Sequence, residues 1–236
     1  MLNLSKAVVA GVVVSALLAG CSWRSAKPQT AVLGPTNAAV YDAVPASLLQ
    51  PLKAGDEIEY VVHDKSTGNR RSVVLRVDRV EATRVRFDQG GRVEKPTGEP
   101  LEVTVVQAGD LDAMMPPGGW GRESLQPGTT WSSSHRGNGA ASNMAYSLKA
   151  EAGAMVTLQT PMGALPVVPI EVWGWAATDK SRNISTPSKV SAQVWYSPQL
   201  RRVVRMESTV KAATNLAPRV FEASRELIEL VAIRRS

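Results

Sequence analysis

The sequence predicts a mainly β protein, with a single antiparallel sheet that is curved or forms an open half-barrel after a disordered tether. Two observations support this fold class. Apolar and polar residues alternate in several short segments, as half-buried strands require. Turn sequences rich in glycine, proline and asparagine separate these segments, and the connections are too short to contain crossover helices. An antiparallel arrangement follows.

The first strands are predicted between residues 52 and 106. Ile58, Tyr60 and Val62 alternate with polar residues, and Thr67-Gly68-Asn69 supplies the turn to the next segment. A further turn is expected at residues 89–91. The predicted extended segments in this half are residues 52–62, 72–80, 84–88 and 101–106.

The middle of the chain breaks this pattern. Residues 114–121 read Met-Met-Pro-Pro-Gly-Gly-Trp-Gly, and prolines and glycines disfavour both ladders and helices. We interpret the segment as a loop between two halves, in which residues 118–121 are expected to be mobile. Residues 125–131 echo residues 52–58 on its other side, so two related halves, residues 51–112 and 123–236, are an open alternative within one domain at 51–236.

The second half contains the longer predicted strands. Residues 154–160 alternate, a turn follows at 161–163, and residues 165–175 are apolar with a single charge. After a polar loop at 178–187, residues 190–210 read as a long hairpin with a proline in its turn. Residues 218–234 fit a helix or a strand, and the β-branched Ile228, Val231 and Ile233 favour a strand in the second half of this segment.

The N-terminus carries an export signal. Lys6 precedes an apolar run at residues 7–18, which is shorter than the roughly 20 residues that span a bilayer. The run ends in Leu18-Ala19-Gly20-Cys21, with small residues before the only cysteine of the chain. An ordinary signal peptide and an uncleaved anchor remain alternatives.

The four residues Leu18-Ala19-Gly20-Cys21 resemble the lipobox of bacterial lipoproteins. The resemblance implies that signal peptide 1–20 is removed and that Cys21 carries three acyl chains, such as palmitate, which hold the protein on a membrane. Ser22 follows the cysteine, and in this class a residue other than aspartate implies the outer membrane, on its periplasmic face. Residues 21–50 are rich in Ala, Pro, Ser and Thr and are expected to form a flexible tether.

The last third of the chain resembles uncharacterised β-rich envelope proteins. The resemblance rests on the turn Thr160-Pro161-Met162-Gly163, the hairpin Val194-Trp195-Tyr196-Ser197-Pro198 and a closing strand near residues 226–230. It implies an antiparallel β architecture and transfers no defined activity.

Catalytic residues are not predicted. His63 beside Asp64, and His135 near Ser132-Ser133-Ser134, come closest to a hydrolase pattern, but no Gly-x-Ser-x-Gly elbow is present. No metal-ligand spacing occurs around the two histidines, and we expect neither a metal nor another cofactor.

Aromatic residues are the candidates for ligand binding. Trp120 and Trp131 are expected to pair, and the others are expected to line a groove, although burial as core is the alternative. The candidate ligand-binding residues are Trp120, Trp131, Trp173, Trp175, Trp195 and Tyr196.

These features favour a noncatalytic binding or scaffolding role in the cell envelope. The net charge of +6 is modest, no basic-aromatic nucleic-acid motif is present, and the expected partners are the membrane, through the lipid, and an envelope protein, lipid or cell-wall polymer. One alternative is a carrier of lipid or lipoprotein acyl chains; another is an envelope hydrolase using His63 or His135. The carrier would line an apolar concave face with Leu158, Leu165, Val167, Trp173 and Val194.

Overall fold

The computed structural model describes residues 43–122, 125–178, 187–214 and 217–236. The expected signal peptide, Cys21, residues 22–42 of the expected tether and nearly all of the polar loop predicted at 178–187 lie outside these residues. Among the described residues, no helix is long and apolar enough to cross a membrane.

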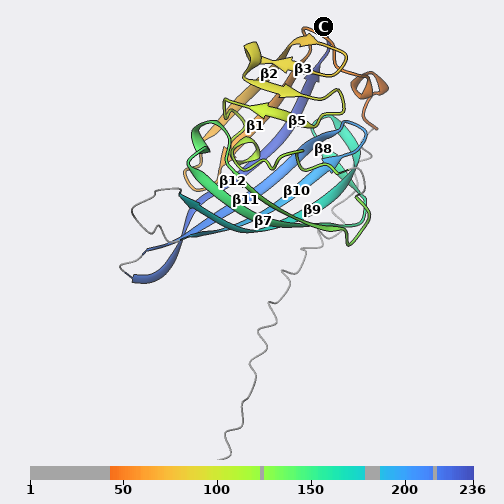
Figure 1. Cartoon of the computed structure of the whole chain (residues 1–236). Coiled ribbons are helices and arrows are strands. Elements are labelled where there is room, and N and C mark those ends of the chain that lie inside the picture. The colour runs from red at the N-terminus through yellow and green to blue at the C-terminus, as the bar shows by residue number, and fades with distance from the viewer. Residues whose placement is uncertain (1–42, 123–124, 179–186, 215–216) are drawn as a thin grey trace, which may run out of the picture. The chain divides into compact units, whose positions relative to one another are not determined.

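The described chain forms one antiparallel sheet of 12 strands that is not closed into a barrel, which confirms the predicted fold class (Figure 1). The sheet order is β5-β4-β3-β2-β1-β12-β11-β10-β9-β7-β6, and β8 pairs with β9 beside this path. The strands are β1 (Glu57–Asp64), β2 (Arg70–Val80), β3 (Val85–Phe87), β4 (Arg92–Glu94), β5 (Pro100–Val103), β6 (Thr130–Arg136), β7 (Met144–Ala152), β8 (Val156–Thr160), β9 (Gly163–Thr178), β10 (Ser188–Ser197), β11 (Arg202–Thr214) and β12 (Ala217–Arg234).

Two meanders share this sheet. From the β1–β12 pair, β1 to β5 extend in order to one edge of the sheet. From the same pair, β12, β11, β10, β9, β7 and β6 extend to the other edge. The predicted hairpin of residues 190–210 is β10 and β11, with Gln193 opposite Glu207. The last segment is strand from Ala217 onward, so the helical alternative for residues 218–234 is wrong.

Burial alternates along the strands, which places the core on one face of the sheet. In β1, Ile58, Tyr60 and Val62 are buried between more exposed neighbours, as side chains of period two require. In β9, Ile170 and Val172 continue the same apolar layer across the sheet. The inner face therefore carries a continuous row of aliphatic side chains.

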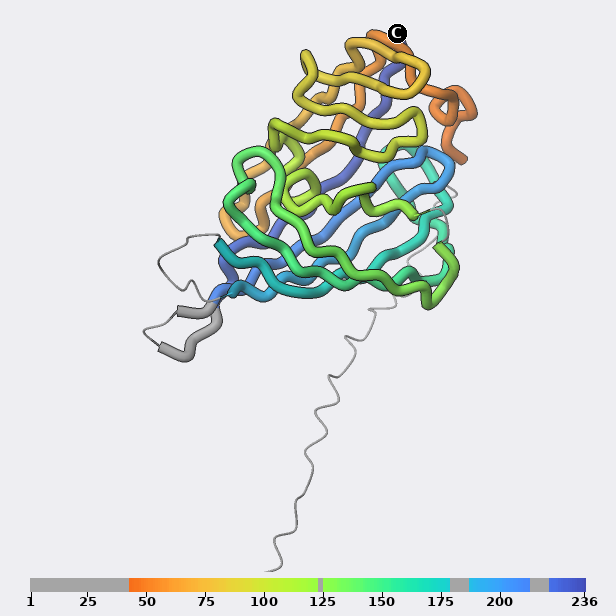
Figure 2. Tube along the Cα trace, viewed as in Figure 1, coloured from red at the N-terminus to blue at the C-terminus, as the bar shows by residue number. Residues whose placement is uncertain are grey.

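A segment without strands covers this inner face. We call residues 108–120 the plug; it includes the single-turn helix α1 (Asp110–Ala113) and runs across the face of the sheet in Figures 1 and 2. Its Leu111, Met114, Met115 and Trp120 are all buried in the same core as the strands. The loop predicted at residues 114–121 is present, but Trp120, in the part expected to be mobile at residues 118–121, is buried against the curved sheet.

The folded body begins before residue 51. Ala43 forms a bridge with Ala164, Val44 is buried, and Leu48 in the short 3-10 helix η1 (Ala46–Leu49) packs against the core. Two further 3-10 helices, η2 (Asp88–Gly90) and η3 (Gly139–Ala141), lie in connections. Residues 43–50 are thus part of the body rather than of the expected tether.

Asp56 ties the two ends of the described chain together. Its carboxylate accepts hydrogen bonds from the backbone N–H of Lys53 at 2.9 Å and of Ser236 at 3.0 Å, and from Arg235 Nη1 at 2.8 Å. Burial raises the pKa of Asp56, but these donors outweigh burial, so its pKa lies below the usual value. Arg235 also donates to the carbonyl oxygens of Leu48 and Gln50.

We expect Asp56→Asn to lower the free energy of unfolding by about 1–3 kcal/mol at pH 7, because a buried charged acceptor with three donors is lost. The lowered pKa means that the contribution is present above the unfolded-state pKa of about 3.9 and is lost as the pH falls through the folded-state pKa. Urea unfolding at pH 7 and below pH 4 checks this. The exposed Glu102→Gln is the control, and a difference from wild type that persists unchanged in acid would contradict the prediction.

Candidate functional site

Four charged side chains meet inside the curved sheet and anchor the plug. Glu94 of β4 accepts from Arg92 Nε at 2.6 Å and from Arg202 Nη2 of β11 at 2.7 Å. Arg92 Nη1 also lies 2.5 Å from Asp112 Oδ1 of α1. We call Arg92, Glu94, Asp112 and Arg202 the buried charge network. It joins the plug to strands on both sides of the β1–β12 pair.

Mutual pairing keeps this network charged. Burial alone would raise the pKa of Glu94, but Arg202 and Arg92 outweigh it and lower the pKa, so the carboxylate stays ionised. The same pairing raises the pKa of both guanidinium groups, although burial acts in the opposite direction. Asp112 Oδ2 accepts in addition from the backbone N–H of Gln107 and Ala108, which fixes the start of the plug.

A pocket of about 740 Å³ opens beside this network. Three connections border it: the β4–β5 turn, the end of the plug with residues 121, 122, 125 and 126, and the β10–β11 turn. Strand residues, among them Tyr60 and Val168, line the rest of its wall. Buried Leu111, Met115 and Trp120 contribute apolar surface to it. Its volume lies within the range of small-molecule sites.

Glycines allow these three connections to come close together. A Cβ atom at Gly98 would lie 2.2 Å from the carbonyl oxygen of Arg201, and one at Gly121 would lie 2.4 Å from the Tyr196 ring. Gly119 approaches Pro100 in the same way. Gly98, Gly119 and Gly121 therefore allow close packing around the pocket.

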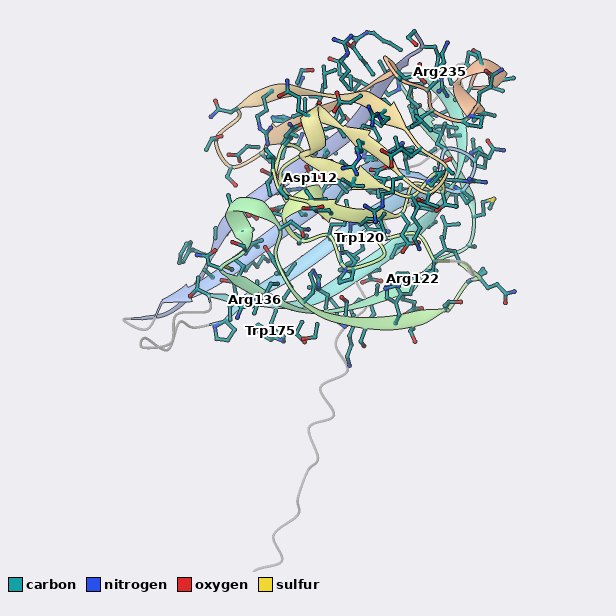
Figure 3. The ribbon with its side chains drawn as sticks, turned by 45° about the horizontal axis from the view of Figure 1, so that its top comes forward. Asp112, Trp120, Arg122, Arg136, Trp175 and Arg235 are labelled. Atoms are coloured by element: carbon teal, nitrogen blue, oxygen red, sulfur yellow. The ribbon has the colours of Figure 1, made fainter. Side chains whose placement is uncertain are left out.

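The sequence-predicted aromatic residues divide between two faces. Trp120 and Tyr196 line the pocket, whereas the other four predicted tryptophans do not. Trp173 and Trp175 alternate with buried Val172 in β9 and so point to the outer face, where Trp175 is 53% exposed. Figure 3 shows Trp120 near the centre of the molecule and Trp175 at its margin.

Arginines contact the two remaining tryptophans. The Arg122 guanidinium lies 5.7 Å from the ring centroid of Trp131, and that of Arg205 lies 5.2 Å from that of Trp195. Trp131 therefore contributes to the site indirectly, since Arg122 itself lines the pocket.

The residues expected to line an acyl-chain hollow are placed differently. Leu165, Val167 and Val194 are fully buried in the core, Leu158 packs against it, and Trp173 lies on the opposite face. The expected lining is wrong because the plug fills the space against the inner face. The pocket is formed instead by connections together with the strand residues beside them, and a strand pattern does not reveal the contribution of the connections.

His135 makes the contacts that come closest to a catalytic pair. Its Nε2 lies 3.1 Å from the carbonyl oxygen of Met114, and its Nδ1 lies 2.9 Å from Ser133 Oγ. Because a carbonyl only accepts, Nε2 carries the proton and the Ser133 hydroxyl donates to Nδ1. Burial lowers the pKa of His135, which favours this neutral form. The ring also stacks on Tyr146.

The surroundings favour a structural role for this pair. Ser133 lies inside the extended strand β6 and not on a sharp elbow. His135 joins this strand to the plug. Asp64, beside His63, accepts hydrogen bonds from Ser66 and Thr67 in its own turn. No group of three or more potential metal ligands occurs in the part of the chain that the structure describes.

No family model and no curated protein matches the sequence. The fold is similar to that of a putative lipoprotein from Parabacteroides distasonis, with 15% identity, a TM-score of 0.46, and coverage of 79% of this chain and 98% of that one. It is also similar to a putative exported protein with YmcC-like fold from Bacteroides fragilis, with 16% identity, a TM-score of 0.45, and coverage of 78% and 98%. The hypothetical lipoprotein YmcC from Escherichia coli shows 10% identity, a TM-score of 0.34, and coverage of 74% and 83%.

We expect Glu94→Gln to lower the free energy of unfolding by about 3–5 kcal/mol, because Arg92 and Arg202 would share one remaining carboxylate in the interior. Glu99→Gln, which removes the exposed pair with Lys95, should cost less than about 1 kcal/mol. Urea unfolding followed by circular dichroism checks both. Equal effects of the two variants would show that the network does not anchor the plug.

We expect Ser133→Ala to lower the free energy of unfolding by less than about 1.5 kcal/mol, through the lost hydrogen bond, and to leave ester hydrolysis at the buffer rate. The assay uses p-nitrophenyl butyrate, with Ser132→Ala on the other face of β6 as the control. Hydrolysis by the wild type that disappears in Ser133→Ala but not in Ser132→Ala would identify a hydrolase.

Proposed function

We propose that this protein is a lipid-anchored component of the cell envelope that binds a ligand noncatalytically in the pocket beside the plug. The N-terminal residues Leu18 to Cys21 support the anchor, and the periplasmic face of the outer membrane is the proposed location. The pocket carries the binding role, because its wall is held by buried ion pairs and by close glycine contacts rather than by loose side chains.

A preformed pocket favours binding over scaffolding alone. Sites whose shape exists before the ligand arrives lose little conformational entropy on binding. The buried charge network fixes Arg92 and Arg202 in the pocket wall, and Tyr60, which donates to the carbonyl oxygen of Val203 at 3.1 Å, fixes another part of that wall. Carriage of an acyl chain is a specific form of this binding role.

We expect the protein purified under mild conditions from membranes of its native host to carry lipid on Cys21 and a noncovalent ligand at a fixed ratio. Intact-mass and native mass spectrometry measure both. Met155 lines the pocket and is 60% exposed, so Met155→Trp should obstruct the mouth without disturbing the core. We expect it to reduce the bound ligand about tenfold, equivalent to about 1.4 kcal/mol.

Val74→Trp is the matched control, because Val74 is also exposed but lies on β2 and does not line the pocket. An unmodified Cys21 would overturn the anchor. A ligand that is absent from the wild type, or that Met155→Trp and Val74→Trp retain equally, would overturn binding in this pocket and favour a scaffolding role.

A further inference from the structure

We infer that the pocket takes an anionic amphiphile: a ligand with a carboxylate or phosphate head on an apolar body. The inference rests on the proposed function and names the chemical class of its ligand. It depends on how charge, apolar surface and an unpartnered donor are distributed in the wall of the pocket.

The charged side chains of the wall leave an excess of positive charge. Five cationic residues line the pocket and only one carboxylate, Glu99, does so. Glu94 and Asp112 pair with Arg92 and Arg202, and Glu99 pairs with Lys95 at 2.7 Å. Among the described residues, Arg122 and Arg201 have no carboxylate partner. An anionic group on a ligand would give these two arginines the ion-pair partner that they lack. The five cationic residues are Arg92, Lys95, Arg122, Arg201 and Arg202.

Both unpaired arginines are held near the pocket. The Arg122 guanidinium lies over Trp131, which restricts its position. Arg201 has a φ of 53°, a left-handed conformation that costs energy for a residue other than glycine. Its carbonyl oxygen is the atom that Gly98 approaches. The β10–β11 turn thus presents an arginine where glycine would be favoured by the backbone.

An unpartnered donor lies in the same wall. Trp120 is 2% exposed, it lines the pocket, and its indole N–H has no hydrogen-bond partner among the described residues. A buried donor without a partner costs about 1–3 kcal/mol, so an acceptor oxygen supplied by a ligand would remove a penalty.

The wall also carries apolar side chains, which distinguish an amphiphile from a small inorganic anion. Leu111, Met115, Val168 and Val203 are buried residues that line the pocket, and the partly exposed Leu125 and Met155 extend this surface. A phosphate ion alone would leave this apolar surface uncovered. An apolar body of several carbons would bury it and gain about 25 cal/mol for each Å² removed from water.

Isothermal titration of the chain from residue 21 onward, with Cys21→Ser to prevent lipidation, tests the inference. Octyl phosphate and octanoate are the anionic probes, 1-octanol supplies the apolar body alone, and inorganic phosphate supplies the head alone. We expect one of the anionic probes to bind at a single site, at least about tenfold more tightly than 1-octanol or inorganic phosphate. Comparing octyl phosphate with octanoate distinguishes a phosphate head from a carboxylate head.

The double variant Arg122→Gln with Arg201→Gly should weaken the anionic probe by at least about tenfold, since charge-assisted hydrogen bonds are lost. Glycine suits the left-handed turn at position 201, so the fold should be retained. Arg79→Gln, an exposed arginine of β2 that does not line the pocket, is the control and should change affinity less than twofold.

Each outcome decides the inference. Equal affinity for octyl phosphate, octanoate and 1-octanol would show that the ligand need not be anionic, and so would unchanged affinity in the double variant. If Met155→Trp still abolished binding in that case, the pocket would remain the ligand site. Binding of inorganic phosphate as tight as that of octyl phosphate would overturn the amphiphile. Failure of every probe to bind would overturn the inference, and the proposed function would fail with it only if no ligand also co-purified from native membranes.

Discussion

The positions of the plug and of the pocket depend on the pairing of Glu94 with Arg92 and Arg202 in the interior. It joins two strands that lie on opposite sides of the β1–β12 pair, and Arg92 extends it to Asp112 at the start of the plug. Buried charges tolerate little displacement, because separating them leaves each one unsolvated. The network therefore determines where the plug lies, and the plug determines the shape of the pocket.

The plug covers the apolar inner face that an open curved sheet would otherwise expose to water. A strongly curved sheet with aliphatic side chains on its inner face needs a second layer to exclude water. In this protein α1 and the residues up to Trp120 supply it, with proline and glycine in place of a covering helix. The backbone can then pass close to neighbouring turns, as Gly121 does beside Tyr196. This irregular second layer leaves a pocket at one end.

Most strands can be predicted from the sequence, although β4 and β7 are not among them, and the site can be predicted only in part. Alternation along residues 58–62 and the proline in the β10–β11 turn are local signals, and local signals determine strands and hairpins. Strand β4 was missed because Arg92 and Glu94 resemble a solvated segment, and their burial depends on Arg202, 108 residues after Glu94. Trp120 and Tyr196 were candidates by residue type, but no pattern could place them in one pocket. The sequence favours mobility at residues 118–121 because burial of Trp120 depends on the sheet beneath it, which no local signal reveals.

Pairing of β1 with β12 has a consequence for biogenesis. Strand β1 can pair with β12 only when the C-terminal end of the chain is present, because Glu57 lies opposite Arg234. Sheets whose partners are so distant in sequence fold slowly, because loop-closure entropy is lost before the contacts form. A chain that emerges from a membrane channel with its N-terminus first cannot complete this sheet until translocation is almost finished. In the export proposed for this protein, the topology would keep the polypeptide threadable and delay its final folding until translocation is complete.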